Sequence, residues 1–182
     1  DTIRPLVEEY VKNKSEFSHE NLYYIGKSRD SSLSRPLLDY HNYIKYALIS
    51  GICDDLKYAS GDITLLDTSC GRGGDLKKWL SPKNKIKFIL GLDISRDISE
   101  AAKRLYNSKE YNSRYFKTDV VFAMSDTGKN IENGDSLKIE DIDLQLPEMR
   151  YSKNILNILY NRNLKDLPES YNDIKAKYTG KA

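Results

Sequence analysis

The chain has 182 residues, a length typical of one domain, and its 29 basic and 27 acidic residues leave a net charge of +2. This near balance excludes a protein that coats nucleic acid by charge alone. Two cysteines and two histidines are too few for a disulfide framework or a zinc cluster, so we expect no metal and a reducing compartment. No apolar run is long enough to predict a membrane span, and we expect no membrane partner.

The first residues, DTIRPLVEEY, lack the basic and apolar regions of a signal peptide and do not begin with Met. We therefore expect a processed chain or a part excised from a longer protein. Apolar residues recur with helical spacing over residues 3–11, and a polar connection follows over residues 12–32. Helix signals resume over residues 34–53, where Ser34 can cap the helix and Pro36 suits its first turn.

Strand and helix patterns then alternate along the chain. Short apolar runs predict buried strands over residues 62–67, 85–94 and 120–124. Helix patterns cover residues 71–80 and 98–108, and shorter ones follow a turn-rich stretch (126–135) at residues 152–161 and 169–178. The order strand, helix, strand, helix, strand implies a parallel sheet built from right-handed crossovers.

A glycine loop follows the first predicted strand, in the sequence ITLLDTSCGRGGDLKKWL (residues 63–80). It reads G-x-G-G-D, so it matches neither the dinucleotide fingerprint G-x-G-x-x-G nor the phosphate loop G-x-x-x-x-G-K-[ST]. Asp67 and Asp75 flank it, and two carboxylates would repel a pyrophosphate in a low-dielectric cleft. This charge favours a cationic ligand without phosphate, and S-adenosylmethionine, with its sulfonium and ammonium groups, fits that description.

Two further acids follow the next predicted strands. Asp93 stands about 20 residues beyond the loop, where an acid can accept both hydroxyls of an adenosine ribose. Asp126 follows the third strand and is placed to hydrogen-bond near the adenine. A lone glycine loop is often a plain turn, and a lone Asp at a strand end is often a helix cap. Their combination at strand carboxyl ends, where open α/β sheets bind ligands, indicates an S-adenosylmethionine site.

Three blocks of the sequence carry a resemblance to one family. LLDTSCGRGGDLKKW resembles the first motif of the mRNA cap guanine-N7 methyltransferases, whose pattern is close to L-D-x-x-C-G-x-G-G-D-L-x-K-W. LLDYHNYIKYALI is similar to the family's helix F-N-N-[FW]-I-K-x-x-L-I, which packs over the cofactor. SDTGKNIENGDS is similar to the same region in the capping enzymes of large DNA viruses. The resemblance covers roughly residues 23–137.

The family resemblance implies an architecture. It is a Rossmann-like α/β fold of the class I S-adenosylmethionine-dependent methyltransferases, mostly parallel in its sheet, with helices on both faces and truncated on the C-terminal side. Residues 1–60 would be an N-terminal helical segment that covers the cofactor site. Residues 61–182 would be the cofactor-binding half of the methyltransferase domain.

The resemblance also implies roles for individual residues. Lys45 would contact the methionine carboxylate, and Asp93 would hold the ribose. The residues implied in binding S-adenosylmethionine, and its product S-adenosylhomocysteine, are Lys45, Asp67, Cys70, Gly71, Gly73, Asp75, Asp93, Ile94, Asp126 and Thr127. On the cap and RNA side the candidates are His41, Asn42 and Arg72, together with Lys77 and Lys78, whose positive charges in a lysine run suit RNA phosphates.

Ordinary explanations remain open for several of these residues. Lys45 also fits a surface lysine that packs its stem and leaves its ammonium in water. His41 stands where the family usually has Asn, so its role on the cap side departs from the pattern, and a half-buried, satisfied histidine fits equally well. The lysine run KKWLSPKNKIK (residues 77–87) also fits a solvated face.

The activity implied is methyl transfer from S-adenosylmethionine to the cap guanine N7 of mRNA, within a larger viral capping enzyme. Its partners would be the capped 5′ end, other domains of that enzyme and a stimulatory subunit. Its location would be the host cytoplasm, a viral factory or the virion. We expect no catalytic residue, because guanine N7 has a free lone pair and in-line transfer needs alignment more than a general base.

One family block has no counterpart. The strand F-D-x-[VI]-S-x-Q-[FY]-x-[IL]-H-Y, which helps to sandwich the cap guanine, finds no match, and the chain stops at KAKYTGKA, about where that strand should begin. Two other classes of function therefore stay open. One is a methyltransferase that acts on another substrate, and the other is a non-catalytic, methyltransferase-like module that binds a partner chain.

Overall fold

The computed structural model describes residues 35–59, 62–113, 118–140 and 142–181. The chain divides into two compact units, residues 1–45 and residues 46–182. Helix α3 (Arg35–Ala59) runs through the boundary between them and confirms the helix predicted from residue 34, although it extends further. The helix predicted over residues 3–11 lies outside the described residues, and the domain division predicted at residue 60 stays a prediction.

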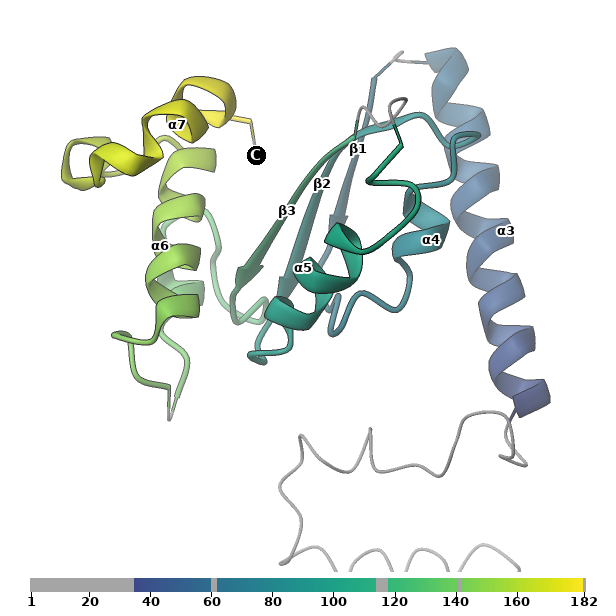
Figure 1. Ribbon diagram of the computed structural model, residues 1–182, viewed down its shortest axis with the longest axis horizontal. Helices are drawn as coiled ribbons and strands as arrows, with labels where there is room; N and C mark the ends of the chain where they lie inside the picture. Colours follow the sequence, from purple (N-terminus) through teal and green to yellow (C-terminus); the bar gives the residue numbers. More distant parts are fainter. Residues whose placement is uncertain (1–34, 60–61, 114–117, 141, 182) are drawn as a thin grey trace, which may run out of the picture. The chain divides into compact units, whose positions relative to one another are not determined.

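A parallel sheet of three strands forms the centre of the second unit (Figure 1). Its strands are β1 (Ile63–Asp67), β2 (Ile86–Asp93) and β3 (Asp119–Met124), in the order β1-β2-β3. Leu66 of β1 lies opposite Leu90 of β2, which in turn lies opposite Val121 of β3. The three strands and the parallel sheet predicted from the apolar runs are thereby confirmed.

Helices and short turns make up the rest of the described chain. The α-helices after the first strand are α4 (Leu76–Trp79), α5 (Ile98–Tyr106), α6 (Pro147–Leu159) and α7 (Asn172–Tyr178). Short 3-10 helices cover Asp135–Leu137, Leu164–Asp166 and Glu169–Tyr171. The helix predicted over residues 71–80 is much shorter than expected, because the glycine loop continues as turns up to residue 75.

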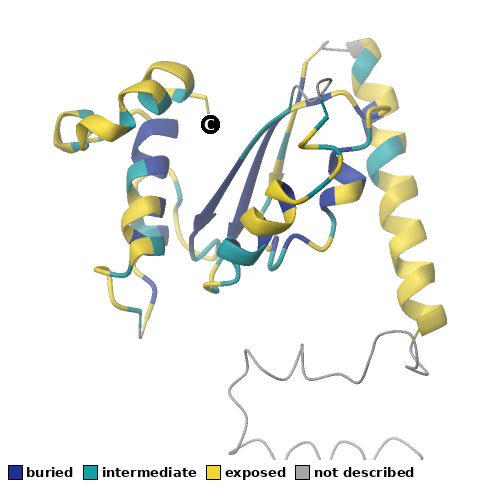
Figure 2. Cartoon of the chain, viewed as in Figure 1, coloured by how far each residue is buried: buried dark blue, intermediate teal, exposed yellow. Residues whose placement is uncertain are grey.

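Apolar side chains cover both faces of the sheet, and the alternation along β3 shows this directly. Phe122 and Met124 belong to one buried cluster with residues of α4 and α5. Val121 and Ala123 point the other way, into a second cluster with α6 and α7. Strands β2 and β3 are therefore buried on both sides (Figure 2), as a parallel sheet between two helical layers requires. The predicted α/β class with helices on both faces is confirmed.

The described residues contain neither a helix that could span a membrane nor a cluster of metal-ligating side chains. None of their helices combines the length and the apolar character that crossing a bilayer demands. Nor do His, Cys, Asp and Glu side chains gather there in groups of three or more that could hold a metal ion. Both cysteines are buried free thiols.

Candidate ligand-binding site at the glycine loop

The loop between β1 and α4 depends on glycine at particular positions. Gly71 and Gly73 have φ angles of 50° and 70°, which L side chains rarely adopt. A Cβ on Gly73 would also lie 2.7 Å from Leu76 Cδ1 and 3.2 Å from Ala101 Cβ, whereas a Cβ on Gly74 would meet nothing within 4 Å. Gly73 therefore lets the loop turn tightly against α4 and α5, and Gly74 is not needed for packing.

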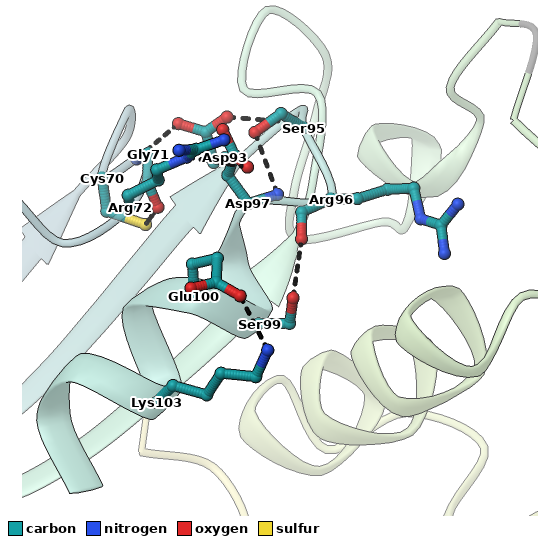
Figure 3. Close-up of polar contacts among 10 residues, drawn as sticks. All are labelled: Cys70, Gly71, Arg72, Asp93, Ser95, Arg96, Asp97, Ser99, Glu100 and Lys103. Atoms are coloured by element: carbon teal, nitrogen blue, oxygen red, sulfur yellow. Dashed lines mark hydrogen bonds and ion pairs between the residues drawn. The ribbon is translucent and has the colours of Figure 1, made fainter. Parts of the chain in front are cut away.

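Asp93 ties this loop to the end of β2 (Figure 3). Its Oδ2 accepts a hydrogen bond from the Gly71 N–H at 2.7 Å, and its Oδ1 accepts one from the Ser95 N–H at 2.9 Å. A carboxylate has about four acceptor positions, and these bonds use two of them. The half-buried Asp93 can thus hold the loop and still accept hydroxyl groups of a ligand. The position of Asp93 could be predicted from the sequence, but Ser95, its second backbone donor, could not.

Cys70 lies beneath the loop as a buried, neutral thiol. Its backbone N–H donates to the Leu92 carbonyl at 2.9 Å, which continues the contact between the loop and β2. Burial and the nearby carboxylates of Asp93 and Asp67 raise the pKa of the Cys70 thiol to about 12. A Cβ on Gly91 would lie 2.7 Å from Phe122 Cδ1 and 3.2 Å from the Cys70 sulfur, so that glycine leaves room for the ring and the thiol. Cys70 shapes the base of the loop and is no nucleophile at neutral pH.

The two acids that flank the loop differ in their surroundings. Asp67 ends β1, and its Oδ1 accepts the Ser69 N–H at 2.9 Å. Asp75 pairs with Lys78, with Oδ1 and Nζ 2.5 Å apart. The Lys78 side chain is only 11% exposed, and its carbonyl accepts a hydrogen bond from the buried Asn84 amide at 2.7 Å. The structure thus places Lys78 in an internal ion pair. Its contact with RNA stays a prediction, and RNA would have to compete with Asp75 for the Lys78 ammonium.

Arg72, between the glycines, reaches toward the start of α5 (Figure 3). Its Nε lies 3.1 Å from Asp97 Oδ1, and Asp97 is the residue just before that helix. This ion pair links the loop to α5 on the same side as the Asp93 contact. Nothing in the sequence pairs Asp97 with Arg72, so this ion pair could not be predicted.

The loop after β3 joins the same edge of the sheet. The hydroxyl of Thr127 donates to the Thr68 carbonyl at 3.1 Å, so the segments after β1 and β3 are in contact. Asp126 Oδ1 accepts the Gly128 N–H at 3.0 Å, and its Oδ2 lies 3.1 Å from Lys129 Nζ. The predicted convergence of acids at the carboxyl ends of the three strands is therefore present in the fold. Their individual contacts with a ligand stay predictions, as does that of Ile94, an exposed side chain next to Asp93.

A polar cavity of about 500 Å³ opens beside the loop, between the start of α4 and the end of α5. Gly73 and Lys77 line it together with Arg104 and Lys109, and Glu110 is its acidic member. Lys77 is exposed there, so it differs from the neighbouring, buried Lys78. Arg104 and Lys109 were not predicted as functional, since their distance along the chain hides their proximity to the loop.

The remaining predicted residues lie on α3. Lys45, His41 and Asn42 belong to the unit formed by residues 1–45, whereas the glycine loop belongs to the other unit. The roles of these three side chains stay predictions.

Comparison with known proteins identifies the class. A sequence model described as the mRNA (guanine-N(7))-methyltransferase domain matches residues 8–151, which is most of the chain. The chain therefore belongs to the family of mRNA (guanine-N7)-methyltransferase domains.

Individual relatives agree with this assignment. The chain is 36% identical over 81 residues, 44% of its length, to mRNA cap guanine-N(7) methyltransferase 1 of Arabidopsis thaliana, of which the match covers 20%. It is 36% identical over 75 residues, 41% of its length, to the mRNA cap guanine-N(7) methyltransferase of Eremothecium gossypii, with 16% of that protein covered. The corresponding protein of Pyricularia oryzae is 28% identical over 85 residues, 44% of this chain and 18% of its own length. The chain thus spans about a fifth or less of these relatives.

Proposed function

We propose that this chain binds S-adenosylmethionine at the glycine loop and belongs to an enzyme that transfers the methyl group to N7 of the mRNA cap guanine. The family assignment and the names of the relatives support the reaction class. The single observation that carries the binding site is Asp93, which stands at the end of β2 and already holds the loop through Gly71.

The residues at this edge fit S-adenosylmethionine in chemistry. Asp93 keeps acceptor positions for the two ribose hydroxyls after its bonds to Gly71 and Ser95. Asp67 places a negative charge at the end of β1, which suits the sulfonium and ammonium of the ligand and disfavours a phosphate. The positive φ angles of Gly71 and Gly73 let the backbone turn where the ligand must approach.

The proposed mechanism needs positioning more than acid–base chemistry. When bound, S-adenosylmethionine supplies an electrophilic methyl carbon, which the N7 lone pair displaces from sulfur. Asp93 and the loop hold the ribose end in place, so the transferable group keeps one orientation. Cys70, the buried thiol nearest the loop, keeps its proton at neutral pH and does not compete with N7 for the methyl group. No proton has to be removed from N7, so no general base is required.

The polar cavity beside the loop supports a contact with the substrate. Lys77, Arg104 and Lys109 contribute three positive charges and Glu110 one negative charge. Such an excess attracts phosphates of the capped RNA, and salt weakens the attraction. We assign this role to Lys77 in preference to Lys78, whose ammonium is occupied by Asp75. Cap-side roles for Arg72, His41 and Asn42, and the methionine contact of Lys45, are part of the proposal.

The wider setting follows from the sequence resemblance. The block SDTGKNIENGDS supports a capping enzyme of the large-DNA-virus type, in which this chain is one part and other capping domains and a stimulatory subunit are partners. Such an enzyme would act in the host cytoplasm or a viral factory, or be carried in the virion.

The experiment that tests the proposal uses the natural full-length protein, labelled S-adenosylmethionine and three RNAs of one sequence. The RNAs carry an unmethylated guanosine cap, a cap already methylated at N7, or an uncapped 5′ triphosphate. We expect label only on the first, at N7, because the second has no free N7 and the third has no cap guanine. Equal labelling of all three RNAs would contradict the proposed acceptor, and label on none, with protein methylation instead, would favour another methyltransferase class.

A further inference from the structure

The outer edge of β3 is open in the described part of the chain, where β2 is its only strand neighbour. The Met124 N–H donates to Ser152 Oγ of α6 at 2.7 Å, so the Met124 backbone points away from β2. The direction of backbone groups alternates along a strand, so Val120 and Phe122 also point outward. Ser152 of α6 thus occupies the edge at Met124, and no strand of the described chain pairs with the edge at Val120 and Phe122. A strand edge without a strand partner is a template for another extended chain.

A groove of about 480 Å³ lies along this outward-facing part of the strand. Val120 and Phe122 line it, and α5 and α6 lie to either side of β3 in Figure 1. The other apolar and aromatic residues that matter for its character are Ile98, Leu105, Tyr106, Pro147 and Tyr151. An edge strand that runs beside an apolar, helix-walled groove is the arrangement by which β-sheets bind extended peptides.

Tyrosines give the groove the composition of a protein-binding surface. Tyr106 is 68% exposed, and Tyr111 and Tyr151 are about two-fifths exposed, at 40% and 39%. The rings of Tyr106 and Tyr111 lie 6.0 Å apart between centroids. Tyrosine is enriched at protein interfaces because it combines a large apolar face with a polar tip and few rotatable bonds.

Glu148, at the start of α6, pairs with Arg96 but has one carboxylate oxygen without a hydrogen bond in the described chain. Its Oε1 accepts a hydrogen bond from Arg96 at 3.3 Å. Its Oε2 is buried and has no hydrogen-bond partner among the described residues. A hydrogen bond from its own backbone N–H, and the Arg96 guanidinium, lower the pKa of Glu148, so the carboxylate is charged at neutral pH. A buried carboxylate oxygen without a donor is unfavourable, and a basic side chain would satisfy it.

We propose that this groove binds an extended segment of a partner protein, which adds a strand to the outer edge of β3 and presents a lysine or arginine to Glu148. Backbone bonds to Val120 and Phe122 set the register, and apolar side chains at alternate positions pack among the tyrosines. RNA does not suit the groove, since Glu148 would repel its phosphates. This site is independent of the glycine loop and of the proposed methyl transfer.

A random peptide library displayed on phage tests the proposal when it is selected on the full chain. We expect the enriched peptides to alternate apolar residues around one arginine or lysine. A synthetic peptide of the best enriched sequence is then titrated into the wild type and two variants. Val120→Pro removes an outward N–H, which an edge strand tolerates, and Glu148→Gln removes the charge while keeping the shape. Each should weaken peptide binding about tenfold or more.

The matched control is Glu132→Gln, an exposed glutamate outside the groove, which should leave peptide binding unchanged. Circular dichroism establishes whether each variant is folded. If Val120→Pro does not fold, Glu148→Gln alone tests the proposal. Hydrogen exchange gives a second readout: the peptide should protect the amides of Val120 and Phe122 and leave Val121, which faces β2, unchanged. The proposal is overturned if no such peptides are enriched, if Glu148→Gln binds them as tightly as wild type, or if RNA displaces them.

Discussion

Replacing Gly73 by alanine should destabilise the chain strongly, because two separate penalties apply at this position. The φ angle of 70° places an L residue in the left-handed region, which costs about 1–2 kcal/mol. The new Cβ would lie 2.7 Å from Leu76 Cδ1 and 3.2 Å from Ala101 Cβ. Both neighbours are buried, at 5% and 0% exposure, so they have little room to move, and overpacking of this kind costs about 1–3 kcal/mol.

Alanine also lowers the conformational entropy of the unfolded chain, which offsets about 0.4–1 kcal/mol of this destabilisation. The expected net loss for Gly73→Ala is therefore about 2–4 kcal/mol. Gly74→Ala is the matched control, because a Cβ there meets nothing within 4 Å, and we expect it to be neutral or slightly stabilising. Urea unfolding followed by circular dichroism measures both free energies of unfolding. Equal effects of the two substitutions would refute the assignment of the strain to Gly73.

Two further predictions concern buried groups. Ser152→Ala should lower the free energy of unfolding in urea by about 1–3 kcal/mol, because it leaves the buried Met124 N–H without its acceptor. The control Ser170→Ala, at an exposed serine, should change this free energy little. Equal losses in the two variants would contradict the reasoning. The raised pKa of Cys70, about 12, means that the folded chain keeps a proton which the unfolded chain releases near pH 8.5, so stability should fall as pH rises above that value. This loss of stability at high pH should be smaller in Cys70→Ala. An identical pH dependence of stability in both proteins would contradict the raised pKa of the Cys70 thiol.

The strands could be predicted from the sequence because their apolar runs are dense. Strand β2, for example, is buried over most of its length, and its sequence IKFILGLD is almost continuously apolar. Helix α6 was predicted only from residue 152, although it begins at Pro147. Among residues 147–151 only Met149 is buried, so the apolar spacing on which the prediction rests begins later than the helix.

The contacts of the site could be predicted less well than its residues. Asp93 was identified from its place after a strand, but its bond to Gly71 joins residues 22 positions apart, and no spacing rule predicts it. Asp75 and Lys78 have the i,i+3 spacing of a helical ion pair, but only the fold shows that the Lys78 side chain is buried there. Arg104 joins Lys77 through the packing of α5 against the loop, which is a tertiary contact without a sequence signal.

The role of Asp93 in holding the ribose of an S-adenosyl ligand can be measured directly by calorimetry. S-adenosylhomocysteine and its 2′-deoxy analogue are titrated into wild type, Asp93→Asn and the exposed control Asp166→Asn. Wild type and Asp166→Asn should bind the natural ligand about tenfold or more tightly than the analogue, since hydrogen bonds to a charged group contribute about 1.5–3 kcal/mol. In Asp93→Asn the difference between the two ligands should largely vanish. The same preference in all three proteins, or no binding by folded wild type, would contradict a ribose site at Asp93.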